Sequence, residues 1–336
     1  MLRLVLAVLA VLALPAAAQE MRGHGGPVRA LAVAPDGRIA LSGSFDTSAI
    51  LWDIERGLAM AVLRGHESSV NAVLALPDGR FATAGEDGRI LLWRIGKAEP
   101  ETRIEGHSGP VAGLALSPDG RFLASASWDG TARVTPIGGG EARVVTGHTG
   151  PLNSVAFTTD GTAIVTGGHD ATIRITPLGE GHARGIDVGS PVAGLVVAPD
   201  GEIVTGGADG RLRFFAADGA RRGEVVAAET PVVAVSLSPD GLRLAAAGIR
   251  GSVALVDRAS RTVERVLVGP GLPVWSLAFR AGTEELMTGG GDRLVRRWLA
   301  TTGEHLGAVV MSRPSEALAR LADHPGAEVF RACSAC

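Results

Sequence analysis

Short apolar segments separated by polar turns run through the chain. Residues 111–116, 122–127 and 49–52 are examples, each made of apolar or small side chains and bounded by Gly, Pro or Asp. Such segments indicate β-strands, and no long stretch between the turns has the apolar spacing of a helix. The pattern therefore predicts an all-β fold.

The turns recur at a nearly constant interval of 40 to 42 residues. One turn tripeptide occurs seven times, with its centre at Asp36, Asp78, Asp119, Asp160, Asp200, Asp240 and the degenerate Gly282. A repeat of this length is typical of one sheet of four short strands. Because such a sheet cannot bury both faces alone, neighbouring sheets are expected to stack, with their small residues where the sheets crowd.

Three further marks lie at fixed places in the repeats. Gly-His pairs stand at residues 23–24, 65–66, 106–107 and 147–148. A second turn carries Asp46, Asp87, Asp129, Asp170, Asp209 and Asp292, and the sixth repeat has Arg250 there instead. Tryptophan follows that turn by six residues at Trp52, Trp93 and Trp298. Together these marks resemble WD-repeat β-propellers, and the resemblance implies a seven-bladed ring, which we place at residues 19–310.

The resemblance also implies a hydrogen-bonded tetrad of His, Ser or Thr, Asp and Trp in each complete blade. The candidate members are His24, Ser42, Asp46 and Trp52; His66, Thr83, Asp87 and Trp93; His107, Ser125 and Asp129; and His148, Thr166 and Asp170. Thr135 and Thr176 replace the tryptophan in blades three and four. A buried carboxylate needs hydrogen-bond donors, so we expect these histidines to be structural rather than metal ligands or catalysts.

No metal site and no catalytic site are predicted. The Asp-Gly turns each carry one carboxylate and lack the alternating acids of a calcium loop, and turn chemistry explains them. Outside the tetrads, only His169 is a candidate histidine for the end of the ring where propellers carry their sites, and no Ser-His-Asp or paired-carboxylate arrangement accompanies it.

The N-terminus has the pattern of a secretory signal peptide. A positive start at Arg3 is followed by an apolar run over residues 4–14 and by Ala16-Ala17-Ala18. We expect cleavage after Ala18 and a periplasmic protein. The apolar run is shorter than the roughly 20 residues that span a bilayer, so an uncleaved anchor is the minor alternative.

Length and charge limit the kinds of partner that the protein is expected to bind. The chain has 336 residues, 46% of them hydrophobic, and a net charge of -3. This length suits one propeller and a tail, and the charge disfavours a nucleic-acid partner. We expect a monomer that does not contact the membrane after signal cleavage.

Both cysteines lie at the C-terminus, as Cys333 and Cys336. In an exported protein this Cys-x-x-Cys has three interpretations: a disulfide, half of a metal site, or the start of a haem attachment motif whose fifth residue is histidine. Gly326 and Phe330 precede the cysteines with the spacing of the N-terminal helix of a class I cytochrome c. This resemblance implies covalent haem c on both cysteines if a histidine follows, at the end of a helical tail over residues 311–336. The chain as given is expected to carry no cofactor, and a local disulfide is the alternative.

Two sets of residues are implied by the propeller resemblance to face one end of the ring, here named the top face. The first set precedes the second-turn position, and the other lies near the start of each innermost strand. From these we select as candidate partner contacts Arg29, Phe45, Asn71, Trp128, Asn153, His169 and Trp275. Aromatic side chains and arginine are common interface anchors, although the aromatics could also fill gaps between blades.

These features predict a periplasmic interaction scaffold that belongs to a propeller and cytochrome c fusion and serves electron transfer with a docked protein. The alternative is a protein-binding propeller without a redox role, and a propeller oxidoreductase is the third hypothesis. For ring closure, the segment over residues 305–310 is expected to form the outer strand of blade seven, in preference to the N-terminus.

Overall fold

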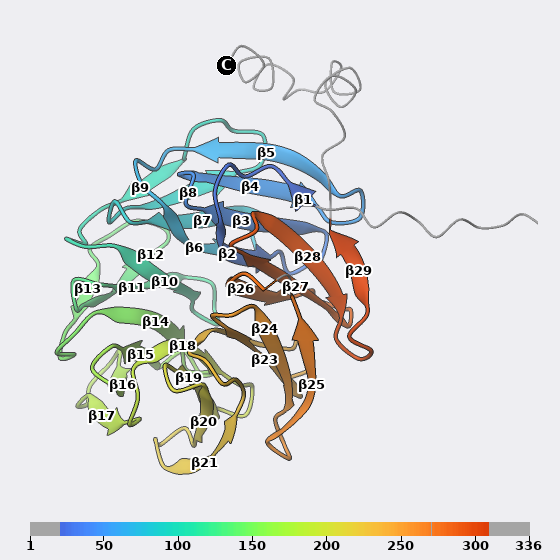
Figure 1. The fold of residues 1–336 in the computed structure, drawn as a ribbon. Coiled ribbons are helices and arrows are strands. Elements are labelled where there is room, and N and C mark those ends of the chain that lie inside the picture. The colour runs from blue at the N-terminus through green and yellow to red at the C-terminus, as the bar shows by residue number, and fades with distance from the viewer. Residues whose placement is uncertain (1–20, 270, 309–336) are drawn as a thin grey trace, which may run out of the picture.

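The computed structural model describes residues 21–269 and 271–308. Within this part of the chain every regular element is a strand, so it contains no helix that could cross a membrane. Seven antiparallel sheets follow one another along the chain (Figure 1), which confirms the predicted all-β, seven-bladed propeller. The predicted signal peptide and helical tail lie outside the described residues.

Blades one to six are each a four-stranded meander whose first strand is innermost. Blade one comprises β2 (Val28–Val33), β3 (Ile39–Ser44), β4 (Ser48–Asp53) and β5 (Leu58–Arg64). Blade two comprises β6 (Val70–Ala75), β7 (Arg80–Gly85), β8 (Ile90–Arg94) and β9 (Thr102–Ile104). Blade three comprises β10 (Val111–Leu116), β11 (Phe122–Ser127), β12 (Ala132–Pro136) and β13 (Arg143–Val145).

The next three blades repeat the arrangement. Blade four comprises β14 (Leu152–Phe157), β15 (Ala163–Gly168), β16 (Thr172–Pro177) and β17 (Arg184–Asp187). Blade five comprises β18 (Val192–Val197), β19 (Ile203–Gly207), β20 (Arg211–Phe215) and β21 (Arg221–Val226). Blade six comprises β22 (Val232–Leu237), β23 (Arg243–Gly248), β24 (Ser252–Asp257) and β25 (Thr262–Val268).

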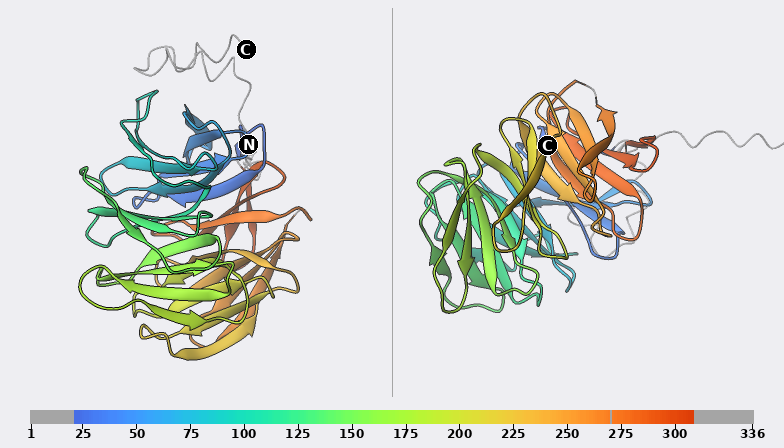
Figure 2. Two further views of the ribbon diagram at one scale, coloured as in Figure 1. Left: turned by 90° about the vertical axis from the view of Figure 1, so that its left-hand side faces the viewer. Right: turned by 90° about the horizontal axis from the view of Figure 1, so that it is seen from below.

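Both ends of the described chain complete blade seven. Its strands are β26 (Val274–Phe279), β27 (Glu285–Gly290), β28 (Leu294–Leu299), β29 (His305–Ala308) and β1 (Met21–Arg22). β1 pairs with the first residues of β28, and β29 pairs with the following ones. The expectation that the C-terminal segment alone forms the outer strand is therefore corrected: the two termini share that edge. Figure 2 shows the first and last blades side by side.

The core consists of seven layers rather than one centre. Seven hydrophobic clusters each join the facing sides of two neighbouring blades, and the one containing Val28 and Met287 joins blade seven to blade one. The second strand of one blade approaches the inner strand of the next very closely. At Gly43 an added Cβ would lie 2.6 Å from Val70 Cγ1, so only a residue without a side chain fits there.

The turns between the first and second strands of each blade use the predicted aspartates as local hydrogen-bond acceptors. In each of the first six turns, the carboxylate accepts the backbone N–H two residues later, at 2.9 to 3.2 Å. The degenerate seventh turn uses Thr283 Oγ1, which accepts the N–H of Glu285 at 3.2 Å. These Asx-type bonds fix the conformation of the turn.

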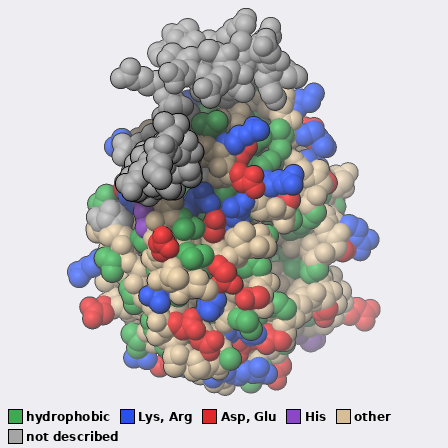
Figure 3. All heavy atoms as spheres, turned by 90° about the vertical axis from the view of Figure 1, so that its right-hand side faces the viewer, with side chains coloured by type: hydrophobic (Ala, Val, Ile, Leu, Met, Phe, Trp, Pro, Cys, Tyr) green, Lys and Arg blue, Asp and Glu red, His purple; other side chains and the backbone are tan. Residues whose placement is uncertain are grey.

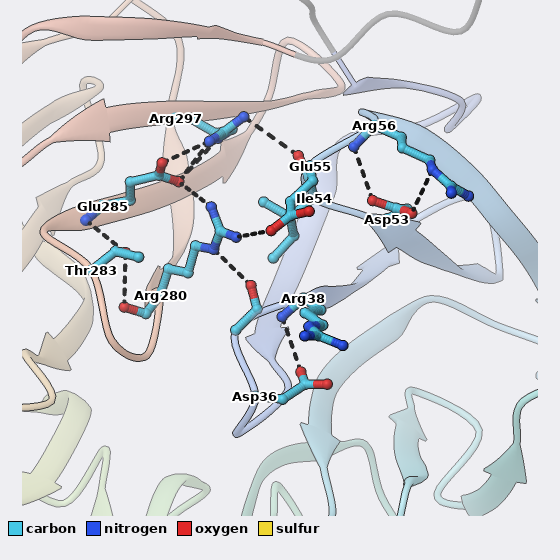
Figure 4. A network of polar contacts seen from close by, with 11 residues as sticks. Asp36, Arg38, Asp53, Ile54, Glu55, Arg56, Arg280, Thr283, Glu285 and Arg297 are labelled. Atoms are coloured by element: carbon cyan, nitrogen blue, oxygen red, sulfur yellow. Dashed lines mark hydrogen bonds and ion pairs between the residues drawn. The ribbon is translucent and has the colours of Figure 1, made fainter.

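An ion-pair network holds blade seven against blade one (Figure 4). Glu285 accepts hydrogen bonds from Arg297 at 2.7 Å and from Arg280 at 3.3 Å. Arg280 Nε also donates to the carbonyl of Gly37 in blade one at 2.6 Å, and its Nη2 lies 3.6 Å from Glu55. Because Glu285 and both arginines are mostly buried, solvent screens this network less than the exposed pairs elsewhere. The network thus adds a polar contact to the apolar layer at the seam.

Candidate functional site

In blades one and two the four tetrad residues form a continuous hydrogen-bonded chain. Trp52 Nε1 donates to Ser42 Oγ at 2.8 Å, Ser42 Oγ lies 2.7 Å from His24 Nε2, and His24 Nδ1 lies 3.1 Å from Asp46. Blade two repeats this with distances of 2.8, 2.8 and 3.0 Å through its corresponding residues Trp93, Thr83, His66 and Asp87. The chain links the outer half of a blade to the top-face turn.

Blades three and four keep the polar part without tryptophan. His107 Nδ1 lies 2.8 Å from Asp129 and its Nε2 lies 2.9 Å from Ser125 Oγ. His148 makes the same contacts with Asp170 and Thr166, each at 2.9 Å. The hydroxyls of Thr135 and Thr176, which replace tryptophan, are buried without a hydrogen-bond partner.

An arginine occupies the space of the missing tryptophan ring in blades three and four. A Cβ added at Gly23 would lie 2.9 Å from Trp52 Cη2, whereas one added at the equivalent Gly106 would lie 2.5 Å from Arg133 Nη1. Gly147 meets Arg174 in the same way. A side chain on the glycine of each Gly-His pair would therefore collide with an indole in two blades and with a guanidinium in two others.

Blades five and seven have no Gly-His pair, and an arginine holds the turn aspartate directly. Arg213 donates to Asp209 through both terminal nitrogens, at 3.0 and 2.5 Å. In blade seven Arg296 donates to Asp292, while Trp298 Nε1 still donates to Thr288 Oγ1 at 3.0 Å. In blade five the hydroxyl of Thr205, which would face a histidine, has no partner.

These four arginines were not among the sequence-based candidates. Each stands four residues after the second-turn aspartate, as Arg133, Arg174, Arg213 and Arg296. The spacing Asp-x-x-x-Arg was a readable signal, because residues two apart on a strand share a face and the third strand begins just after the turn. Blade six lacks it, with Arg250 at the turn and Ala254 four residues later.

The tetrad contacts shift the ionisation of their members. Burial alone raises the pKa of Asp129, but hydrogen bonds from Thr131 and His107 outweigh it and hold the pKa at about 2. The pKa of Asp46 likewise falls well below its usual value, since the bonds from His24 and Ser48 outweigh desolvation. Burial lowers the pKa of His107 and of His148 against the opposing carboxylates. These two rings are thus neutral at pH 7, with Nδ1–H donating to the carboxylate and Nε2 accepting from the hydroxyl.

The top face is built on one repeated backbone contact. In every blade the residue before the second-turn position donates its N–H to the carbonyl just before the inner strand, at 2.8 to 3.1 Å. The seven donors are Phe45, Glu86, Trp128, His169, Ala208, Ile249 and Gly291. Their side chains start from equivalent places, so the differences between blades lie in side-chain chemistry alone.

A second repeated feature is a β-bulge near the start of every inner strand. The register with the second strand shifts at the same position in all seven blades. The bulged residues are Arg29, Asn71, Ala112, Asn153, Ala193, Val233 and Trp275. We name these residues the inner ring. A bulge leaves its residue out of the ladder and re-aims its side chain, which is why bulges often occur beside functional sites.

The aromatic candidates fall into two places. Phe45 and Trp275 make an edge-to-face contact, with ring centroids 5.0 Å apart, and Phe45 remains 39% exposed. Trp128 is also exposed, but its Nε1 donates to Asn153 Oδ1 at 3.1 Å. Asn153 Nδ2 in turn donates to the carbonyl of Val192 at 2.9 Å, so Trp128 is tied to a bond between blades four and five.

Comparison with known protein families identifies the repeats. Residues 17–53, 57–94, 98–135 and 139–176 match the family described as WD domain, G-beta repeat. The chain carries four WD40 repeats in a seven-bladed propeller. A comparison with curated proteins found no match. The matched repeats supply the His-containing blades of this WD-repeat propeller, and the unmatched blades five to seven lack the Gly-His pair.

The remaining top-face candidates of the WD-repeat propeller differ in their contacts. Arg29 and Asn71 are partly buried, and neither side chain has a hydrogen bond or ion pair among the described residues. Desolvation lowers the pKa of Arg29 from its ordinary value, although the guanidinium stays charged. His169 is exposed on blade four.

Among the described residues, no group of three or more His, Cys, Asp or Glu side chains could hold a metal ion. The candidate haem ligands Cys333 and Cys336 lie outside them. Propellers of this kind generally serve as protein-interaction scaffolds rather than enzymes. The face shown in Figure 3 carries acidic and basic side chains interspersed, so no single sign of charge dominates it.

Proposed function

We propose that this propeller is an interaction scaffold that docks a protein partner on the part of its top face formed by blades seven, one and two. This docking surface is supported by a contrast between the backbone of the top face and the side chains that it carries. Backbone contacts and bulges are the same in all seven blades, whereas the side chains differ: the exposed Phe45 packs on the partly buried Trp275, and Arg29 and Asn71, on neighbouring inner strands, have free polar groups. Aromatic side chains and arginine contribute most of the binding energy at many protein interfaces.

Site-specific photo-crosslinking in the native host tests the docking surface. A photoreactive amino acid replaces Phe45 in one variant and Leu58, an exposed residue on the outer strand β5, in the control. We expect a discrete protein adduct from position 45 and none from position 58. Equal adduct patterns from the two positions, or no adduct from position 45, would contradict the proposal.

A second proposal concerns compartment and redox role. The signal-peptide pattern ending at Ala18 supports export to the periplasm. The spacing of Gly326, Phe330, Cys333 and Cys336 supports attachment of haem c to a longer form of the protein, in which the propeller docks the electron-transfer partner. When bound, the haem would supply one-electron transfer, and the two cysteines would hold it through thioether bonds.

Sequencing the gene past the codon for Cys336 and expressing the full reading frame with a c-type maturation system tests this proposal. We expect a histidine codon next, processing after Ala18, and a covalent haem band in the reduced-minus-oxidised spectrum. The matched control is a variant in which alanine replaces both cysteines, which should keep the propeller and lose the band. A stop codon in place of histidine would leave the interaction scaffold without a redox role.

A further inference from the structure

We propose that Arg29 and Asn71 bind a carboxylate side chain of an acidic, extended segment of the protein partner, while the Phe45–Trp275 pair contacts an apolar side chain of the same segment. This inference names the chemistry of the partner and rests on the proposed docking function. It follows from three independent observations on neighbouring positions of the top face.

The first observation is an unneutralised charge. Arg29 is partly buried on β2 and has no ion pair, in contrast to Arg213, which pairs with Asp209, and Arg258, which pairs with Glu202. Arg133 and Arg174 also lack an ion pair, but their guanidinium groups pack against the glycines of two Gly-His pairs. Arg38, which also lacks a side-chain partner, is exposed and therefore solvated. Partial burial of an unpaired guanidinium costs free energy that a bound carboxylate would recover. The folded chain thus provides no anionic partner for the Arg29 guanidinium.

The second observation is a free amide on the neighbouring inner strand. Asn71 holds the position equivalent to Arg29 on β6, the inner strand that packs next to β2. Its side chain has no hydrogen bond among the described residues. By contrast, Asn153, at the equivalent position in blade four, uses its amide for hydrogen bonds with Trp128 and Val192. A guanidinium and an amide N–H together can satisfy both oxygens of one carboxylate.

The third observation is the location of the aromatic pair. Trp275 is the inner-ring residue of blade seven, whose strand β26 packs on β2 from the other side. Phe45 donates its N–H to the carbonyl of Pro27, two residues before Arg29. The strand of Trp275 therefore packs on one side of the strand of Arg29, and the strand of Asn71 packs on the other. A ligand satisfying all three carries an acidic and an apolar side chain, which favours a protein segment over a small inorganic anion.

Selection from a random peptide library tests the inference. The probe is a library of linear peptides displayed on phage, selected on the purified propeller and on the Arg29→Gln variant. The affinities of the strongest peptide and of its Glu→Gln or Asp→Asn analogue are then measured for both proteins by calorimetry. We expect an acidic residue at one fixed position, and a loss of at least about 30-fold when either Arg29 or the peptide carboxylate is neutralised.

The double substitution separates a direct contact from an indirect one. When Arg29 is already glutamine, neutralising the peptide acid should cost little more, because the interaction is already absent. Arg38→Gln removes an exposed arginine from the same blade and should leave the affinity unchanged. Arg29→Gln should also fold with an unfolding midpoint no lower than that of the wild type, since Arg29 has no intramolecular partner to lose; a clear drop would overturn the assignment.

The remaining outcomes distinguish failure of the proposed carboxylate recognition from failure of the proposed docking function. Peptides that lose affinity with Trp275→Ala but not with Arg29→Gln would overturn carboxylate recognition and leave the docking function standing. Peptides that bind equally to the wild type and to a Phe45→Ser, Trp275→Ala double variant would overturn both. Affinity that is unchanged by neutralising the peptide acid would likewise overturn the inference.

Discussion

Blades three and five use different hydrogen-bond donors for the aspartate at the equivalent turn position. In blade three a neutral His107 bonds Asp129, and Arg133 packs on the neighbouring glycine. In blade five the histidine is missing, and the equivalent Arg213 turns its guanidinium onto Asp209. The turn therefore requires a donor for its carboxylate but does not require histidine.

Blade six shows the third solution. It has no acid at the second turn, and the positions of the hydroxyl and tryptophan carry Ala246 and Val256, which are fully buried. Its four strands are nonetheless complete. Removing the carboxylate also removes the need for a donor, because a well-packed apolar set can replace a buried polar group at little cost. Apolar layers hold each blade in the ring, and the polar tetrad is an addition to them.

The largest effect is expected where a tetrad also anchors the core. Trp93→Ala removes a side chain that is 1% exposed and the N–H bonded to Thr83, so we expect a loss of about 3 to 5 kcal/mol in the free energy of unfolding. Trp128→Ala removes an exposed indole and should cost less than about 1 kcal/mol. Denaturation in urea measures both. Similar losses would mean that tetrad tryptophans do not carry the inter-blade core.

The next effect concerns pH and separates the two kinds of blade. The pKa values of His107 and His148 lie below their ordinary value in the folded protein, so the unfolded chain binds more protons below about pH 6.5. Stability should fall as the pH drops from 7 towards 5, by at most about 1.4 kcal/mol per pH unit for each histidine. Unfolding free energies measured across this range test the slope.

Replacing both histidines with glutamine should flatten that slope, while Arg213→Met should leave it unchanged. The folded pKa of Asp209 is depressed, chiefly by Arg213, so its contribution is present above about pH 4 and is lost only at lower pH. A slope between pH 7 and 5 that survives in the double histidine variant would show that other groups cause it.

The third prediction compares the stability cost of the same Arg→Met substitution in blades five and three. Arg213→Met removes the side-chain donors of Asp209, and because that carboxylate is 36% exposed we discount the cost for screening to about 1 to 2 kcal/mol. Arg133→Met should cost less, since His107 still bonds Asp129. Thermal unfolding of the two variants gives the order. The reverse order would mean that Arg133 stabilises the blade by packing more than Arg213 does by pairing.

The smallest effect has opposite signs in two blades. Thr205 is buried and its hydroxyl has no partner, so Thr205→Val should stabilise the protein by about 1 kcal/mol. Thr83→Val removes the acceptor of Trp93 and the contact with His66, and should destabilise it by about 1 to 3 kcal/mol. Urea titrations of the pair test the sign. Stabilisation by both would show that the tetrad hydroxyl is dispensable.

The sequence supported the fold better than the site. Turn residues are local, because Asp36 bonds a neighbour two positions away, so their spacing reports the number of blades. The tetrads could be assigned by resemblance, yet the replacement of an indole by Arg133 was missed since it depends on which side chain reaches a glycine 27 residues away. The pairing of both termini with β28 was also missed, because the pairing of β1 with β28 joins residues far apart in the sequence.

By itself, the sequence determined the seven repeats, their strands and the donors available for each turn, because these follow from patterns within a few residues. Only the tertiary structure decided which donors are used and which are left over. Arg133 and Arg213 each stand four residues after a turn aspartate, yet only Arg213 bonds that carboxylate, because in blade three His107, 22 residues from Asp129, already bonds it. The reason is that a charge is paired or unpaired according to the strands packed against it, and those strands come from distant parts of the chain.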